Sequence, residues 1–171
     1  MRGSSIVAAT ISLLGLLGHA DAAGQITVLI LPIAFADTSG EVGDQSDLHR
    51  HRLDLMGAEL AASLSADGRQ RAELVNQADL DLNCPHSDST CILALAQRRG
   101  AGRLLVAEAS KTSTLILNVN ARLIDVSTNR RVAARFVSFR GDTDEAWRRT
   151  ARFLAQQISQ AASAPPGGQP Q

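Results

Sequence analysis

The chain has 171 residues, 17 basic and 17 acidic, and carries no formal net charge. That length corresponds to one ordinary domain that can bury a core without depending on disulfides. The balanced charge and an aromatic content of only 3% argue against nucleic-acid binding and against aromatic platforms that stack on bases or sugars.

The N-terminal residues predict export. Arg2 precedes an apolar run over residues 6–17, and Ala-Asp-Ala at residues 20–22 offers small side chains where a signal peptidase cuts. The run is too short to span a bilayer, so we expect residues 1–22 to be a signal peptide. No cysteine follows the cut to carry a lipid. We therefore expect a periplasmic or secreted protein without stable membrane insertion after cleavage.

The first half of the chain alternates strand and helix patterns. Residues 26–35, ITVLILPIAF, form an apolar run rich in β-branched side chains, which predicts a strand buried on both faces. Pro32 removes an amide donor, so the far end of this strand should lie at an edge or a bulge. Leucines and a methionine recur every three or four residues over 46–66, which predicts an amphipathic helix. Residues 71–75 predict a brief second strand.

Residues 76–90 are polar and irregular, which indicates a loop. A short helix should follow over residues 91–99, with Thr90 as its N-terminal cap. Residues 104–109, LLVAEA, predict the next strand.

Residues 114–126 alternate apolar and polar side chains with period two, which predicts a strand with one packed face and one polar face. The packed face should contain Leu115, Leu117, Val119, Ala121 and Leu123. A turn at residues 127–130 and an antiparallel return strand over 131–139 should follow. The final helix should open at residues 142–144 and bury a stripe made of Trp147, Ala151, Leu154 and Ile158.

The sequence from Ala161 onward, AASAPPGGQPQ, has little apolar surface to offset the entropy of ordering. We expect one domain over residues 23–162 and a disordered tail over 163–171. The predicted element order is β-α-β-α-β-β-β-α. This order favours an α/β (α+β) fold, in which helices pack on a mixed sheet of about five strands.

Cys84 and Cys91 enclose a short motif, Cys-Pro-His-Ser-Asp-Ser-Thr-Cys. An even number of cysteines in an exported chain favours a disulfide. His86 makes a copper or zinc site the alternative, because thiolate and imidazole suit these metals. A closed zinc site needs four ligands and the motif offers three, so we favour the disulfide. The spacing is not Cys-x-x-Cys, which argues against a thioredoxin-type role.

Residues 49–52, His-Arg-His-Arg, fall early in the first predicted helix. Two histidines that are two positions apart lie on different faces of a helix, whereas a metal pair needs a spacing of three or four. We therefore expect a solvated basic stretch.

An acidic loop follows the first predicted strand and contains Asp37, Glu41, Asp44 and Asp47. Many α/β folds bind ligands at such loops. The loop lacks the order of acidic residues that binds calcium, and a solvated surface loop is the simpler interpretation.

Three segments together carry a resemblance to known envelope proteins: ITVLILPIAFADTSGE, GAGRLLVAEASK and LNVNARLIDVSTNRRV. Their features are a strand ending in Pro-x-x-Phe, a Gly-Ala-x-x-Leu-Val strand entry and a Leu-x-Asp-Val hairpin. Residues 26–160 thus resemble the N-terminal α/β domain of the Tol-system translocation protein and the curli-secretion and peptidoglycan-synthase-activating lipoproteins. They resemble most a family of small secreted bacterial proteins with no assigned function. Glu108 and Asn129 stand where glycine is common, and Asn129 still tolerates a positive φ.

The resemblance implies a binding or assembly module and not an enzyme. No nucleophile elbow, phosphate-binding loop or dinucleotide motif is present in the sequence, and no cofactor is expected. We therefore predict an exported, non-catalytic module of the bacterial cell envelope that binds an envelope protein and no nucleic acid. The candidate contact residues are Asp37 and Glu41 in the acidic loop and Asn118, Asn120 and Arg122 on the polar strand face. If that hairpin lies near a sheet edge, strand addition is the favoured binding mode.

Two alternatives remain open at this stage. The first is a periplasmic metal or small-molecule carrier that uses the Cys84–Cys91 loop, which requires free thiols. The second is a hydrolase whose site matches no known motif, since convergent sites need not share one.

Overall fold

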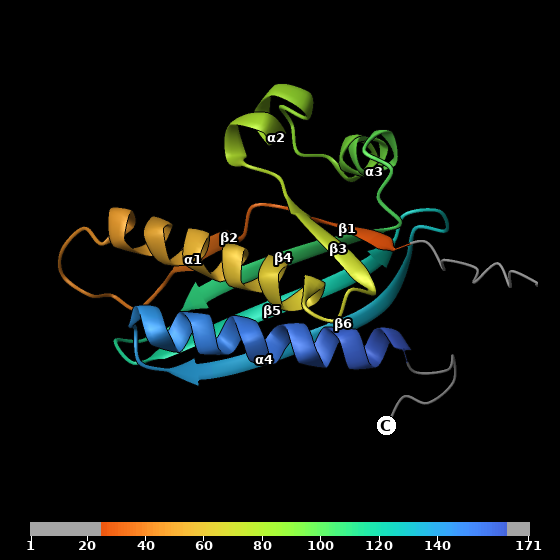
Figure 1. Ribbon diagram of the computed structural model, residues 1–171. Helices are drawn as coiled ribbons and strands as arrows, with labels where there is room; N and C mark the ends of the chain where they lie inside the picture. Colours follow the sequence, from red (N-terminus) through yellow and green to blue (C-terminus); the bar gives the residue numbers. More distant parts are fainter. Residues whose placement is uncertain (1–24, 164–171) are drawn as a thin grey trace, which may run out of the picture.

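The structure is a computed structural model that describes residues 25–163, so the expected signal peptide and nearly all of the expected tail lie outside the described residues. One mixed sheet of six strands carries four helices, as the predicted fold class requires (Figure 1). The elements are β1 (Ile26–Ile30), β2 (Ala34–Asp37), α1 (Ser46–Ser65), β3 (Gln70–Leu74), α2 (Gln77–Asn83), α3 (Ser89–Arg98), β4 (Arg103–Lys111), β5 (Ile116–Asp125), β6 (Arg130–Arg140) and α4 (Asp144–Ser163).

The strand order is β3-β1-β4-β5-β6. β1 runs parallel to β3 and β4, because helical crossovers connect these strands. β4, β5 and β6 are antiparallel and are joined by hairpins. The turn between β5 and β6 places Asn129 at a φ of 53°, which asparagine tolerates, as the sequence indicated.

The predicted first strand is divided in two. β1 ends at Ile30, Pro32 lies in the break, and β2 then pairs with the far half of β4. The residues Val28, Leu29 and Ile30 are fully buried, as expected for a strand covered on both faces. β2 differs from that expectation. Ala34 and Ala36 are exposed, because α2 and α3, the two helices on their side of the sheet, do not extend over β2.

Helices α1 and α4 lie side by side across one face of the sheet (Figure 1). They enclose the main core with the packed side of β5. The predicted α4 stripe is confirmed, since its four members, Trp147, Ala151, Leu154 and Ile158, have no exposed surface. Leu115 was expected on the same packed face, but it precedes β5 in the hairpin turn and is 62% exposed.

Helices α2 and α3 pack on the opposite face, where they cover β1, the start of β4 and the end of β5. The sequence analysis assigned α2 to a loop, which was wrong. Its pattern was too short to recognise, because Leu80 is its only buried residue. The cap of α3 also differs: the Asp88 carboxylate, not Thr90, accepts the Cys91 amide hydrogen bond at 2.9 Å.

The C-terminal helix reaches the end of the described residues. α4 continues to Ser163, and Ala161 and Ala162 pack partly against the main core. Small alanine side chains are enough for the last turn to bury some surface, although the sequence suggested that the segment could bury none. Within residues 25–163, no helix has both the length and the apolar character that a bilayer span requires.

Burial of alternate β5 side chains gives a direct test of the faces. Leu117 is 1% exposed within the main core, whereas its neighbour Asn118 points to the other side of the sheet. Leu117→Ala should cost about 2 to 5 kcal/mol of unfolding free energy, because it leaves a cavity. Asn118→Ala should cost less than about 1 kcal/mol, as for most changes outside the core. Urea melts of both variants check this, and equal losses would contradict the assignment of the faces.

Candidate functional site

The polar side of β5 lies on the part of the sheet that α2 and α3 leave uncovered. Asn120 is paired with Glu108 of β4 on one side and with Phe136 of β6 on the other. Asn120, Glu108 and Arg122 are exposed, and Asn118 is half-buried. Phe136 is 69% exposed. This exposure is notable because the chain has only four phenylalanines, and large apolar side chains are usually buried. We call the surface formed by these five residues the open face.

The open face combines features that recur in the centres of protein–protein interfaces. Such interfaces are enriched in aromatic and arginine side chains and surround them with groups that form hydrogen bonds. The sequence analysis placed Asn118, Asn120 and Arg122 on one surface, and the structure does bring them together. It missed Phe136. The alternation in RFVSF could have indicated it, because Phe136 and the partly buried Phe139 are three positions apart and lie on opposite faces of β6.

Of the four acidic residues assigned to the acidic loop, only Glu41 is directed back toward the protein, whereas Asp37, Asp44 and Asp47 are exposed. Asp37, at the end of β2, accepts a hydrogen bond from the Ser39 amide at 2.9 Å, and the Ser39 hydrogen bonds keep the pKa of Asp37 below its ordinary value. Glu41 accepts hydrogen bonds from Lys111 and from Gln45, and the Lys111 ammonium lowers the pKa of Glu41. The role of Asp37 and Glu41 in binding a partner stays a prediction.

Lys111, at the end of β4, is the centre of a buried ion cluster. Its side chain is 1% exposed, and its ammonium group contacts the carboxylates of Glu41 and Asp142, the latter at 2.9 Å. Gln45 accepts a further hydrogen bond at 3.0 Å. Burial alone would lower the pKa of Lys111, but the contacts with Glu41 and Asp142 outweigh burial and raise it. Lys111 therefore stays charged in the interior.

Asp142 receives donors from three elements. Its carboxylate accepts from Arg52 at 2.7 Å, from Trp147 Nε1 at 2.9 Å and from Lys111 Nζ, and lies 3.0 Å from His49 Nε2. Burial by itself would raise the pKa of Asp142. The hydrogen bonds from Trp147, Lys111 and His49 and the charge of Arg52 lower it instead, to about 2. Asp142 thus joins α1, β4 and the start of α4.

The expected solvated basic stretch is only half correct. Arg50 and His51 are exposed, but His49 and Arg52 are buried and belong to the ion cluster. The helical spacing could have predicted this burial. Positions 49, 52 and 56 lie on the same side of α1 as the buried residues Leu60 and Leu64. The sequence analysis expected His49 and Arg52 to be solvated. Their buried partner, Asp142, is far away in the sequence and could not be recognised from neighbouring residues.

The ion cluster holds α1, β4 and the start of α4 together. Its acidic and basic groups are saturated by one another, and a fully paired buried network is rigid. Within residues 25–163, no group of three or more histidine, cysteine or acidic side chains is placed to hold a metal ion.

Asp142 gives a pH-dependent stability that can be measured. Its folded-state pKa is lowered from 3.8 to about 2, so its contribution is fully present above the ordinary value and is lost as the pH falls toward 2. We expect about 2 kcal/mol of unfolding free energy from this group to disappear between about pH 5 and pH 2. Asp142→Asn should be less stable at pH 7 and should lack this part of the pH dependence.

The comparison needs urea melts of the natural protein and the variant at several pH values. Asp144→Asn is the control, because Asp144 also contacts Arg52, at 3.2 Å, but is much more exposed. It should keep the natural pH dependence. Parallel curves for the natural protein and Asp142→Asn would contradict the role given to Asp142.

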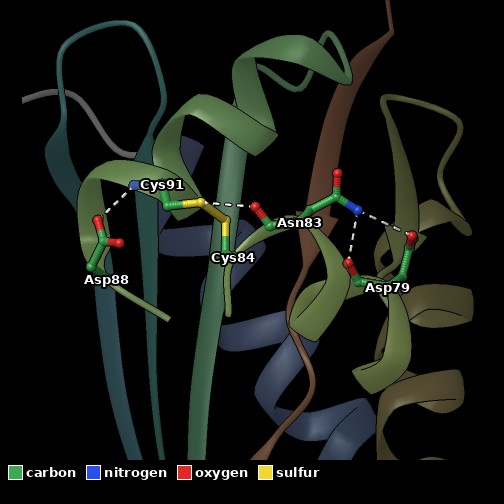
Figure 2. Close-up of a disulfide and its surroundings, with 5 residues drawn as sticks. All are labelled: Asp79, Asn83, Cys84, Asp88 and Cys91. Carbon is green, nitrogen blue, oxygen red and sulfur yellow. Dashed lines mark hydrogen bonds between the residues drawn. A yellow bond between two sulfur atoms is a disulfide. The ribbon is translucent and has the colours of Figure 1, made fainter. Parts of the chain in front are cut away.

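The structure contains the expected disulfide between Cys84 and Cys91, with their Cα atoms 5.7 Å apart (Figure 2). It joins the end of α2 to the first turn of α3. Asn83 Nδ2 donates to the Asp79 backbone oxygen at 2.8 Å, and Asp88 caps α3 from the other side. Cys84 is fully buried in the second core, so the disulfide holds the two helices together over that core.

The metal alternative for this loop loses two of its three ligands. Both sulfurs are consumed by the disulfide, and His86 is exposed. A single imidazole is too little for a copper or zinc site.

Breaking the disulfide should loosen the α2–α3 cover. In the chain-entropy model, a loop this short contributes about 2 to 3 kcal/mol. The double variant Cys84→Ala/Cys91→Ala should therefore unfold at lower urea concentration, and reductant should shift the natural protein similarly but leave the variant unchanged. Intact-mass measurement after alkylation verifies the state of the sulfurs, and two free thiols in protein recovered from the periplasm would contradict the disulfide.

The fold is shared with solved bacterial proteins of low sequence identity. PelC from Paraburkholderia phytofirmans, solved as a dodecamer, has a TM-score of 0.51 and 17% identity, covering 83% of this chain and 89% of that chain. TolB from Acinetobacter baumannii has a TM-score of 0.51 and 14% identity, covering 84% of this chain but 30% of TolB. Lipoprotein GNA1162 from Neisseria meningitidis has a TM-score of 0.45 and 16% identity, covering 81% of this chain and 97% of that chain.

The likeness to TolB confirms the resemblance in fold that the sequence motifs indicated. No curated protein sequence matches the chain. The family DUF3280, described as a protein of unknown function (DUF2380), matches residues 26–158, which is most of the described structure. The chain therefore belongs to this family, as the resemblance to a family without assigned function predicted.

Proposed function

We propose that this chain is an exported, non-catalytic binding module of the bacterial cell envelope, which acts through contacts between proteins. The open face carries the proposal. It presents an exposed aromatic ring among polar and charged side chains, on a sheet surface that no helix covers within residues 25–163. An exposed phenylalanine in the middle of a strand has an unfavourable contact with water, and a partner that covers it gains free energy.

The rest of the molecule supports a rigid platform for this surface. The opposite sheet face is covered by α1 and α4, and the ion cluster around Lys111 and Asp142 fixes the end of the hairpin strands. A surface on strands that cannot rearrange binds with little loss of conformational entropy. PelC, with the same fold, is recorded as a dodecamer, so surfaces of this fold can serve contacts between chains.

The two alternative functions are less well supported. A carrier that uses the Cys84–Cys91 loop requires thiolates, and the disulfide removes them. A hydrolase requires an acid, a base or a nucleophile that can reach a bound substrate. Asp142, Lys111 and His49 are instead directed at one another in the interior. Asp37 and Glu41 are secondary candidates for contact, because both carboxylates already have partners within the chain.

The test uses capture of partners from the native cell envelope. The triple variant Asn118→Ala/Asn120→Ala/Arg122→Ala and the single variant Phe136→Ser should keep the natural melting temperature to within a few degrees, as surface changes usually do. They should recover a cross-linked partner about tenfold less well than the natural protein, because losing an interface residue at the centre costs at least about 1 to 2 kcal/mol.

Asp54→Ala/Gln156→Ala is the control, because both side chains are exposed on the helices of the opposite layer. This variant should capture the same partner as well as the natural protein does. Unchanged capture by the open-face variants would overturn the proposal. Hydrolytic or redox turnover that is abolished by one polar substitution would overturn it as well.

A further inference from the structure

β6 forms one free edge of the sheet and is its longest strand, with eleven residues. β5 is its neighbour on the inner side, and within residues 25–163 no strand pairs with it on the outer side. Such an edge presents a row of unpaired backbone donors and acceptors that another extended segment can use.

The hydrogen-bond pattern identifies which backbone groups face outward. The Gly141 amide donates to the Leu115 carbonyl at 3.0 Å, just beyond the last β5–β6 pair. In an antiparallel ladder the hydrogen bonds to one neighbouring strand recur at every second residue. The backbone N–H and C=O groups of Phe139 and Val137 therefore also point toward β5. The N–H and C=O groups of Phe136 and Ser138 consequently point away from the sheet. The side chain of Phe136 belongs to the open face, so the free backbone and the open face adjoin.

The charge on β6 is entirely positive. Its sequence, RRVAARFVSFR, contains Arg130, Arg131, Arg135 and Arg140 and no acidic residue. None of these four guanidinium groups belongs to an ion pair within residues 25–163. Asp125 lies opposite Arg130, but its carboxylate accepts hydrogen bonds from Ser127 and Thr128. The protein as a whole is neutral, so this concentration of charge is local.

This charge decides between possible occupants of the edge. If two copies of the chain paired through β6, two sets of four arginines would meet along one ladder. In the register that places Arg135 opposite its counterpart, Arg130 also faces Arg140, and like charges in such positions are destabilising. An added strand with acidic side chains at alternate positions would instead place carboxylates beside Arg135, on the sheet face that α1 and α4 cover, where opposite charges stabilise cross-strand pairs. The side chains between these carboxylates would lie on the other face of the added strand, beside Phe136 on the open face, and apolar residues there would cover its ring.

We propose that β6 binds an acidic, extended segment of another protein as an added antiparallel strand. The inference rests on the proposed function, for which it names the partner chemistry and the mode of binding. The backbone groups of Phe136 and Ser138 supply the main-chain hydrogen bonds, the four arginines select carboxylates, and Phe136 packs against the partner's apolar side chains.

The experiment selects peptides without assuming their composition. The protein is expressed from its full sequence, with its own N-terminal segment, and is recovered after export. A displayed library of random ten-residue peptides is then panned against it. The enriched peptides should be acidic, should alternate with β-branched residues and should bind more weakly as the salt concentration rises. Hydrogen exchange with the strongest synthetic peptide should show new protection at Phe136 and Ser138.

Two variants at one position separate strand addition from other contacts. Ser138→Pro removes an outward amide that β5 does not use, and proline is tolerated on edge strands. It should weaken peptide binding about tenfold or more, since it removes a backbone bond and blocks close approach. Ser138→Ala keeps the amide and should bind within about twofold of the natural protein, because it leaves the backbone bond intact. Melting temperatures show that both variants are folded.

Charge is tested with Arg135→Gln/Arg140→Gln, which should weaken the acidic peptide severalfold and reduce its salt dependence. Neutral or basic peptides in the enriched pool, no enrichment, or equal binding by Ser138→Pro and Ser138→Ala would overturn the inference. Pairing of two copies through β6, seen as a dimer that Ser138→Pro dissociates, would also overturn it. Each of these results leaves the proposed function intact if the open-face variants still lose their envelope partner, so the two failures are distinguishable.

Discussion

The buried carboxylate of Asp142 is the interaction on which the arrangement of this fold depends. It lies between β6 and α4 and accepts from Arg52 of α1, Lys111 of β4 and Trp147 of α4. Segments that are far apart in sequence are thereby fixed at one end of the sheet. A buried charge is costly unless it is paired and fully hydrogen-bonded, so the partners cannot separate without a large loss of free energy. The cluster therefore sets where α1 and α4 lie on the sheet.

The opposite side of the sheet is organised differently. Only the two short helices α2 and α3 cover that side. A disulfide between Cys84 and Cys91 holds them together over a second, smaller core. Two short helices cannot cover six strands, so the outer part of the β4–β5–β6 hairpin array stays bare. The asymmetry explains why β5 alternates buried and polar residues whereas β1 is buried on both faces.

The open face and the β6 edge follow from this asymmetry. Phe136 belongs to both, since its side chain stands on the open face and its backbone lies on the free edge. In the binding mode that we propose, the arginines along β6 disfavour pairing of two copies through the strand and at the same time favour acidic partners. A single strand can thus be protected against aggregation and selective in binding, because both properties depend on the sign of its charge.

The sequence determined the elements whose cause is local. Period-two alternation in β5, the spacing of apolar residues in α4 and the grouping of Asn118, Asn120 and Arg122 on one face followed from neighbouring residues alone. The pairing of the two cysteines followed from their even number in a chain that is expected to be exported. Only the tertiary structure decided what depends on distant partners. Burial of His49 and Arg52, the exposure of Phe136 beside Asn120 and the free outer edge of β6 all arise from strand order and helix cover. Local patterns predict which face a side chain occupies, but they do not show whether another element covers that face.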